Sequence, residues 1–453
     1  MRRRMVIALA LLGTLVLAPG GTAQQAPTPP MNPPVGAAAA KQMTATARTL
    51  TIEEAEAIAI RDNPQITVGK LHALEAHEFV REARSALMPQ VNMSVTAVDS
   101  NPGSRIAAGY LTNPTIYPRA AAGVAVSQLI TDFGRTTNLL SSSQFQAKME
   151  DENAVATRQQ IILAVDEAFY NVLETKALLK VAEETVEARQ NLVDQIQALT
   201  TAKLRSDIDL SFSKVDLARA KLLMLESENS YEASLSTLSA ILGYPESQAF
   251  SVVESGAQTV TPPATDPLPL IQQAIQLRPE ILALQNQVTA AERFGRAEHD
   301  LWWPTVSAMG VTGLAPVRDD HISSWYGGVG VNINIPVFNG FLFNARAKSA
   351  DLETQVQRKK LQDLEDNVAR DVRNSWLDTG KAYERLSVTK QLREQADLTL
   401  ELADARYKLG LGTIVEFSQA ELQKTDAELQ DTDAHYQYIL SQIVLAYEMG
   451  LTR

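Results

Sequence analysis

The chain has 453 residues and a formal net charge of −12, an acidic balance that argues against a nucleic acid partner. It contains no cysteine, which excludes disulfides, thiol chemistry and a lipid-bearing N-terminal cysteine. Hydrophobic residues make up 45% of the chain and aromatic residues only 6%, so we expect long helices rich in alanine and leucine rather than a sandwich core.

The N-terminal residues have the pattern of an export signal. Residues 1–23 combine the basic Arg2–Arg4 with an apolar run and the small residues Gly21–Ala23, as in a signal peptide. Residues 24–49, rich in proline and alanine, are predicted to form a flexible tether. Nothing later reaches the ~18 consecutive apolar residues of a spanning helix, which leaves a soluble periplasmic protein or a β-barrel.

The rest of the chain contains an internal duplication. Pro64 and Pro89, in NPQI and MPQV, recur 215 positions later as Pro279 and Pro304, in RPEI and WPTV. We therefore assign a first repeat to residues 50–245, a linker or equatorial segment to 246–266, and a second repeat to 267–453. The linker is expected to pack with the region near Leu50 around the middle of the molecule.

Each repeat contains one very long helix and two shorter helices. Apolar residues recur at three and four spacing, and proline and glycine are absent from 135–200. We predict helices at 64–88, 135–200 and 207–242, and at 280–303, 341–409 and 413–449. About 66 residues of helix extend ~100 Å, so two short helices stacked beside a long one would form a rod. On helix evidence alone, an ordinary antiparallel coiled coil is the alternative.

Four segments show the period-two alternation of β-strands, at about 89–99, 121–131, 304–314 and 325–337. Each is about ten residues long, which is the length needed to cross a bilayer at a tilt and to contact outer-membrane lipid. Aromatic residues near their ends are predicted at the membrane interface, although plain core packing is the more common role of such residues: Tyr117, Trp302, Trp303, Trp325 and Tyr326.

Four strands are too few to close a membrane barrel, because an open edge in lipid leaves backbone groups unpaired. The chain is therefore expected to assemble with copies of itself. Periodicity alone does not separate a dimer from a trimer.

Several motifs resemble the TolC-like outer-membrane efflux protein family. The most specific is ARYKLGLGTIVEFSQAELQKTDAELQ at Ala405–Gln430, which is similar to the family's second helical tip. FYNVL at Phe169–Leu173 and ILGYP at Ile241–Pro245 are also similar, and Ala202–Leu222 resembles the first tip without its turn glycine. The resemblance covers about residues 50–451.

The resemblance implies a mixed α/β membrane protein located in the outer membrane and extending into the periplasm. Long antiparallel hairpins would form an α-barrel, and four strands per chain would form a 12-stranded β-barrel in a homotrimer. Such a protein is the exit duct of a tripartite efflux or type I secretion system. It passively conducts substrates from an inner-membrane transporter through a periplasmic adaptor, or membrane fusion protein.

The resemblance also carries over site residues at the second tip. Glu416 matches an acidic pore position, Gln419 stands where a second acid is expected, and Asp209 matches an acid on the first tip, so these three form the expected pore constriction. Tyr407 retains the aromatic residue of the tip latch, whereas Gly412 replaces its basic residue, which implies a weaker or different latch. The alternative for Glu416 is a solvated carboxylate on a helix face.

The turns at the two tips are the expected adaptor contacts, because exposed apolar residues at a turn favour a docking role. These residues are Lys203, Leu204 and Arg205 in the first tip and Leu409, Gly410 and Leu411 in the second. A helix C-cap explains Gly410 equally well.

The sequence predicts no enzyme, cofactor or metal site. His72 and His77 do not have the spacing of a zinc helix, and GGVG at Gly327–Gly330 lies within a strand pattern rather than before a helix. A periplasmic coiled-coil adaptor or scaffold is the alternative function, but it would need one hairpin flanked by compact β-domains. A secreted hydrolase would need a compact segment with convergent polar groups.

Overall fold

The structure is a computed structural model that describes residues 48–99, 101, 119–254, 262–315 and 323–452. These residues belong to one compact unit, Ala47–Arg453. Two long helical hairpins dominate it: α3 (Arg135–Thr201) with α4 (Asp207–Ile241), and α7 (Leu342–Lys408) with α8 (Ile414–Glu448). The long helices have 67 residues each, which corresponds to ~100 Å. All six predicted helices are confirmed, with ends within four residues of those expected.

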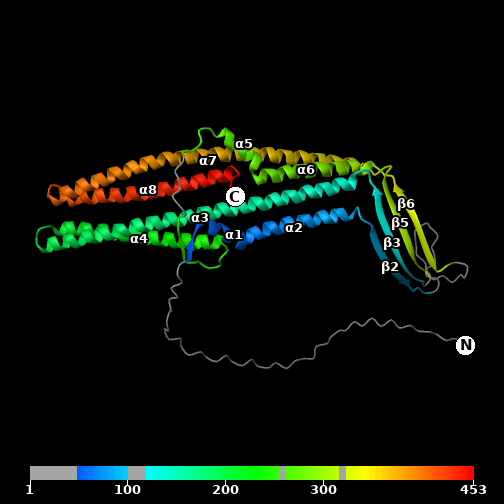
Figure 1. Ribbon diagram of the computed structural model, residues 1–453, viewed down its shortest axis with the longest axis horizontal. Helices are drawn as coiled ribbons and strands as arrows, with labels where there is room; N and C mark the ends of the chain where they lie inside the picture. Colours follow the sequence, from blue (N-terminus) through cyan, green and yellow to red (C-terminus); the bar gives the residue numbers. More distant parts are fainter. Residues whose placement is uncertain (1–47, 100, 102–118, 255–261, 316–322, 453) are drawn as a thin grey trace, which may run out of the picture. The chain divides into compact units, whose positions relative to one another are not determined.

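The helices form a layer in a defined order. Near the sheet, α2 (Pro64–Ser85), α3, α6 (Pro279–His299) and α7 lie side by side in that order. Toward the tips the order is α4, α3, α8 and α7 (Figure 1). The shorter helices thus pack along opposite halves of the long ones, as predicted. No helix in the described part of the chain is both long and apolar enough to cross a membrane.

Local chemistry accounts for where several helices begin. Asn63 Oδ1 accepts a hydrogen bond of 2.8 Å from Gln65 N, and Pro64 occupies the first helical position of α2. Two further helices, α1 (Ile52–Asp62) and α5 (Leu268–Leu277), were not predicted. The start of α1 had a sequence signal, because Thr51 Oγ1 caps Glu54 N in an S/T-x-x-E motif.

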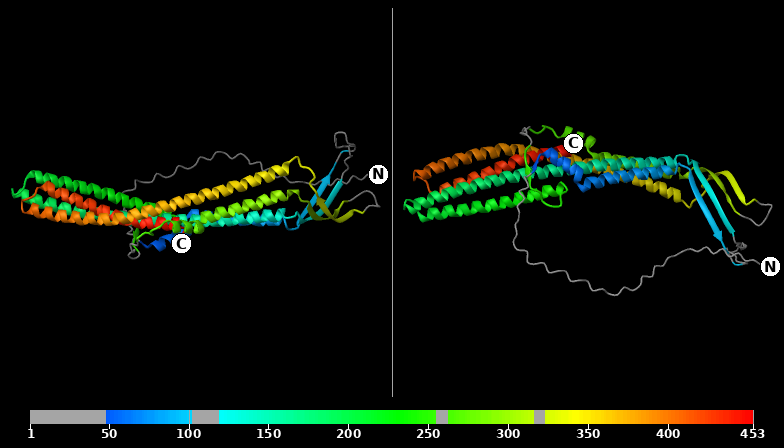
Figure 2. Two further views of the ribbon diagram at one scale, coloured as in Figure 1. Left: turned by 90° about the horizontal axis from the view of Figure 1, so that it is seen from above. Right: turned by 60° about the horizontal axis from the view of Figure 1, so that its bottom comes forward.

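The four strands form one antiparallel sheet in the order β2, β3, β5, β6. Their bounds are Gln90–Val98, Arg119–Thr131, Thr305–Leu314 and Trp325–Asn334. Each strand adjoins one helix of the layer, so the sheet and the helices near it share the same order (Figure 2). The β3–β5 pair joins the two repeats. β2 and β6 are the edges, and each has one side without a strand partner among the described residues.

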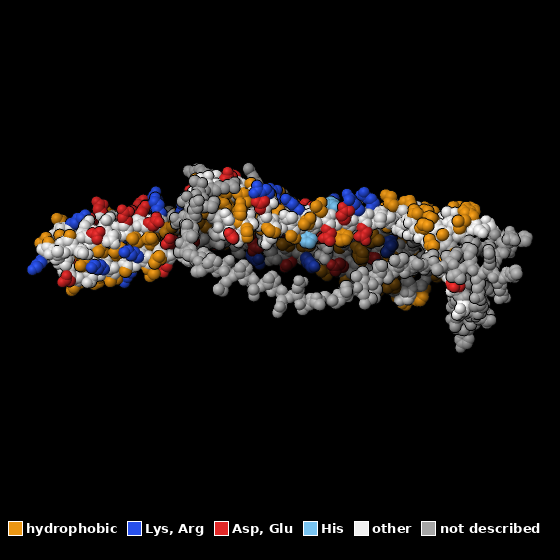
Figure 3. Space-filling model, turned by 90° about the horizontal axis from the view of Figure 1, so that it is seen from below, with side chains coloured by type: hydrophobic (Ala, Val, Ile, Leu, Met, Phe, Trp, Pro, Cys, Tyr) orange, Lys and Arg blue, Asp and Glu red, His pale blue; other side chains and the backbone are white. Residues whose placement is uncertain are grey.

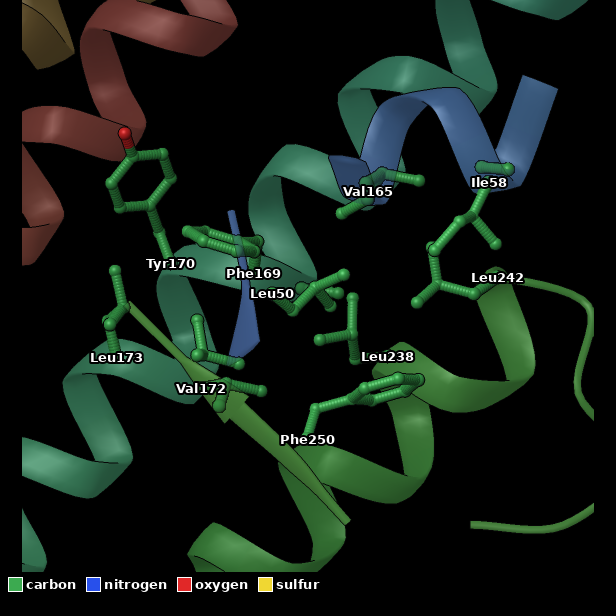
Figure 4. Packing of buried hydrophobic residues seen from close by; sticks show 14 of the residues in the cluster. Leu50, Ile58, Val165, Phe169, Tyr170, Val172, Leu173, Leu238, Leu242 and Phe250 are labelled. Carbon is green, nitrogen blue, oxygen red and sulfur yellow. The ribbon is translucent and has the colours of Figure 1, made fainter. Parts of the chain in front are cut away.

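The main hydrophobic core lies where the first hairpin meets the equatorial segment. β1 (Arg48–Leu50) pairs in parallel with β4 (Phe250–Val252), so this part of the linker packs with the region near Leu50, as predicted. Leu50, Phe169, Val172 and Leu238 are buried together beside Phe250 (Figure 4). Burying such side chains stabilises the fold by about 1.5–3 kcal/mol each. This core holds α1, α3 and α4 together.

Candidate functional site at the helical tips

The two turns that end the hairpins have the same backbone geometry. Leu204 N donates to Leu199 O at 2.8 Å, and Leu411 N donates to Arg406 O at 2.8 Å. Each turn contains one left-handed residue, Lys203 (φ 59°) in the first and Gly410 (φ 74°) in the second. The first turn therefore forms without the glycine that its conformation favours.

Apolar side chains are exposed at both tips. Leu204, Leu409 and Leu411 have relative exposures of 71%, 74% and 69%. Lys203 and Gly410 are also exposed. Five of the six expected adaptor contacts are therefore accessible in a single chain.

Arg205, the sixth expected adaptor contact, is half-buried against the second tip. Its guanidinium lies 4.2 Å from the centre of the Tyr407 ring, and Nη2 donates to Tyr407 O at 3.0 Å. Tyr407 is buried and stacks on Phe417 with ring centres 5.5 Å apart. Burial raises the pKa of Tyr407, Arg205 opposes this shift and Asp209 adds to it. A basic residue from the first tip thus contacts the aromatic residue of the second.

Glu416 lies close to the end of α7. Its Oε2 is 3.8 Å from Arg406 Nη2, and its backbone N donates to Thr413 Oγ1, which caps α8. A Cβ at position 412 would lie 3.2 Å from Glu416 Oε2, so Gly412 leaves room for this carboxylate. Glu416 and Gln419 are exposed and Asp209 is half-buried, and none of the described hydrogen bonds or ion pairs joins these three residues.

Sequence reasoning missed a buried polar cluster some turns from the tips. The guanidinium of Arg189 on α3 forms an ion pair with Glu421 on α8. Ser418 Oγ, also on α8, donates to Asp216 Oδ2 on α4 at 2.6 Å. A signal was present, because Arg189 occupies the same face of α3 as the buried Ala182, Val193 and Ile196.

Two buried carboxyl groups lie toward the middle of the long helices. Burial raises the pKa of Asp166 to about 8, and the nearby Glu56 raises it further. Burial likewise raises the pKa of Glu174 to about 7, with a contribution from Asp433 across the α3–α8 contact, while Arg385 opposes the shift. Folding therefore shifts both groups toward the protonated form.

Aromatic residues gather where the helices meet the sheet. Trp303 stacks on Phe133 at 5.5 Å between ring centres, and Trp302 contacts Phe343 edge-on at 5.5 Å. Hydrophobic side chains gather at this end of the helices (Figure 3). Trp325 and Tyr326 are exposed at the opposite end of the sheet, at the start of β6. Tyr117 lies outside the described residues.

The four-stranded antiparallel sheet continued by two long helical hairpins is a fold shared with solved outer-membrane proteins. The fold is similar to that of VceC from Vibrio cholerae, with a TM-score of 0.77 and 17% identity over 88% of this chain and 96% of that one. It is also similar to the open state of the Neisseria gonorrhoeae MtrE outer membrane channel, with a TM-score of 0.74 and 17% identity over 89% of this chain and 90% of the other.

The sequence assigns the chain to a protein family. Residues 57–244 and 270–451 match the model of the outer membrane efflux protein family, and the chain belongs to that family. It is 24% identical to the outer membrane protein TolC of Escherichia coli (strain K12) over 404 residues, which cover 86% of this chain and 80% of TolC. The predicted family, the predicted fold of the single chain and the outer-membrane location, with helices extending into the periplasm, are therefore confirmed.

Proposed function

We propose that three copies of this chain form the outer-membrane exit duct of a tripartite efflux or type I secretion system. The observation that carries the proposal is that both the four-stranded sheet and the helical layer end in edges that no described part of the single chain covers. β2 and β6 each have an edge without a strand partner in the described part of the chain, α2 and α7 end the helical layer beside the sheet, and α4 and α7 end it toward the tips. An open edge in lipid is costly, so neighbouring copies would complete it.

Exposed apolar residues along the outer helix support this assembly. On α4 they recur at helical spacing and would pack against α7 of the next copy: Ile208, Phe212, Val215, Leu222 and Leu225. Three copies supply twelve strands, whereas two supply eight. An eight-stranded barrel is just wide enough to be filled by its own side chains, so a duct favours three.

At the tips, Glu416, Gln419 and Asp209 would narrow the entrance. Three copies of Glu416 near the threefold axis would attract cations. Tyr407 and Gly412 mark the latch, and Arg205 supplies the basic group that Gly412 lacks. The exposed leucines of the two turns would receive a periplasmic adaptor that links the duct to an inner-membrane transporter. The duct conducts passively and catalyses no reaction.

The periplasmic adaptor is less well supported. That alternative expects one hairpin between compact β-domains, whereas the described residues contain two hairpins and one four-stranded sheet of membrane length. Family membership favours the duct as well.

Single-channel recording in planar bilayers tests the proposal, with Glu416→Ala as the variant. We expect cation-selective steps whose selectivity falls in Glu416→Ala. Glu228→Ala, which removes an exposed carboxylate from the middle of α4, should leave selectivity unchanged. Equal cation selectivity in both variants would show that Glu416 does not act in the pore. A folded protein without conductance would contradict the proposed duct.

A further inference from the structure

A charged groove of about 400 Å³ runs between α6 and α7, at the end of these helices that adjoins the sheet. It begins at His299, the last residue of α6. Exposed aromatic residues flank this end: Trp302 and Trp303 follow α6, and Phe338 and Phe341 precede α7. Aromatic side chains gather at membrane interfaces, so the groove would lie level with the headgroups of the lipid leaflet nearer the helices.

The carboxylates of the groove are already paired. Glu292 Oε1 lies 2.6 Å from Arg358 Nη2, and Asp351 Oδ1 lies 3.1 Å from His299 Nε2. The lining contains three basic side chains against these two carboxylates, so its net charge is positive even when His299 is neutral. A ligand that complements the groove is therefore an anion.

Arg296 and Lys348 are the basic residues of the groove that remain unpaired. Both are exposed, and neither takes part in an ion pair or side-chain hydrogen bond among the described residues. Lys348 lies six residues from Leu342, the start of α7, or ~9 Å along the axis. Its Cα–Cβ bond is tilted toward that N-terminus and hence toward the sheet, so its ammonium group can extend to the level of the headgroups.

The groove opens on the face of the helical layer that carries α5. Arg358 and Trp376 are eighteen residues apart on α7, which is about five turns, so both side chains project from the same face. Trp376 Nε1 donates at 2.7 Å to Ala264 O, in the segment that leads into α5. In the proposed duct this face is the outer one, because a further layer inside the ring of helices would fill the duct. Access to lipid thus rests on the proposed function.

We propose that this groove binds the phosphodiester headgroup of an anionic phospholipid, phosphatidylglycerol being the simplest, in the leaflet that faces the periplasm. Arg296 and Lys348 contact the phosphate oxygens, and the acyl chains extend past the exposed aromatic residues into the bilayer. A phosphate beside two unpaired cations gains charge-assisted hydrogen bonds, and basic pockets between helices at a membrane surface bind such headgroups. A lipid is favoured over free phosphate because the aromatic side chains supply apolar contacts to its chains.

Native mass spectrometry of the detergent-purified protein with added phosphatidylglycerol tests the proposal. We expect about 25-fold weaker binding in Arg296→Gln/Lys348→Gln, since each basic residue near anionic lipid contributes about fivefold. Arg373→Gln/Lys390→Gln is the matched control and should bind as wild type does. It also removes one exposed arginine and one exposed lysine, but from a part of α7 farther from the sheet. Arg296→Lys/Lys348→Arg keeps both charges and should retain binding.

Equal lipid affinity in the charge-removing and control variants would overturn the proposal, as would binding of phosphatidylcholine as tight as that of phosphatidylglycerol. Displacement of the lipid by equimolar glycerol phosphate, which has the phosphate without acyl chains, would assign the groove to free phosphate instead. The same spectra report the number of chains. A mass other than three chains contradicts the proposed duct, whereas three chains without bound lipid contradict the headgroup site alone.

Discussion

At the scale of single residues, the raised pKa of Asp166 predicts a pH-dependent stability. Asp166 is buried in α3 beside Glu56, with a pKa of about 8 against an ordinary value of 3.8. Between these values the folded state retains a proton that the unfolded state has released. The stabilising contribution is therefore fully present below about pH 4 and is lost as the pH rises through 8.

We expect the unfolding temperature to fall between pH 5 and pH 8 in wild type and to change less in Asp166→Asn. The contribution of one such group is at most about 1.4 kcal/mol per pH unit. Thermal unfolding by circular dichroism across this range measures the slope. Asp194→Asn, which changes an exposed carboxylate on the same helix, should retain the wild-type slope; equal slopes in both variants would contradict the assignment.

The backbone conformation of Lys203 is expected to lower the stability of the first turn. This left-handed conformation, which Gly410 adopts in the other tip, disfavours a side chain. Lys203→Gly is expected to stabilise the first turn by about 1 kcal/mol, detected as slower amide exchange at Leu204. Ala202→Gly is the control, because Ala202 has φ −76° and gains nothing from glycine. Faster amide exchange at Leu204 in Lys203→Gly would contradict a strained backbone at Lys203.

At the scale of elements, one aromatic ring packs closely across the sheet. Tyr326 on β6 is paired with Gly313 on β5, and a Cβ at Gly313 would lie 2.6 Å from the Tyr326 hydroxyl. Gly123 on β3 faces the same hydroxyl. The ring thus covers two glycines on neighbouring strands and connects three of the four strands.

Gly313→Val should therefore destabilise the sheet by about 1–3 kcal/mol, because the ring and the Ala122 carbonyl cannot both stay in place. Gly330→Val is the matched control on β6, since nothing lies within 4 Å of a Cβ there. Thermal unfolding of both purified variants compares them. Equal losses would show that the valine side chain, rather than the ring contact, causes the effect.

At the scale of the whole molecule, the open edges of sheet and helical layer predict the assembly. The native mass of the protein in mild detergent should correspond to three chains, because the eight strands of two chains would leave no room for a duct. Native mass spectrometry distinguishes this from two chains. A dimer at concentrations where channel activity is seen would contradict the proposed architecture.

The sequence by itself determined the elements, because their signals are local. Period 3.6 marked the long helices, period two marked the strands, and Asn63 with Pro64 marked a helix start. The repeated prolines predicted a duplication, and the motif at Ala405–Gln430 indicated the family. The short α1 and α5 were missed, since a helix of about ten residues carries little periodicity of its own.

Only the tertiary structure decided which distant side chains meet. Arg205 was predicted to face an adaptor, yet it also contacts Tyr407 in the other hairpin. Arg189 and Glu421 are likewise far apart in the chain, and neither has a local pattern that names its partner. Contacts of this kind depend on how α3 and α8 pack, which the periodicity of either helix leaves open.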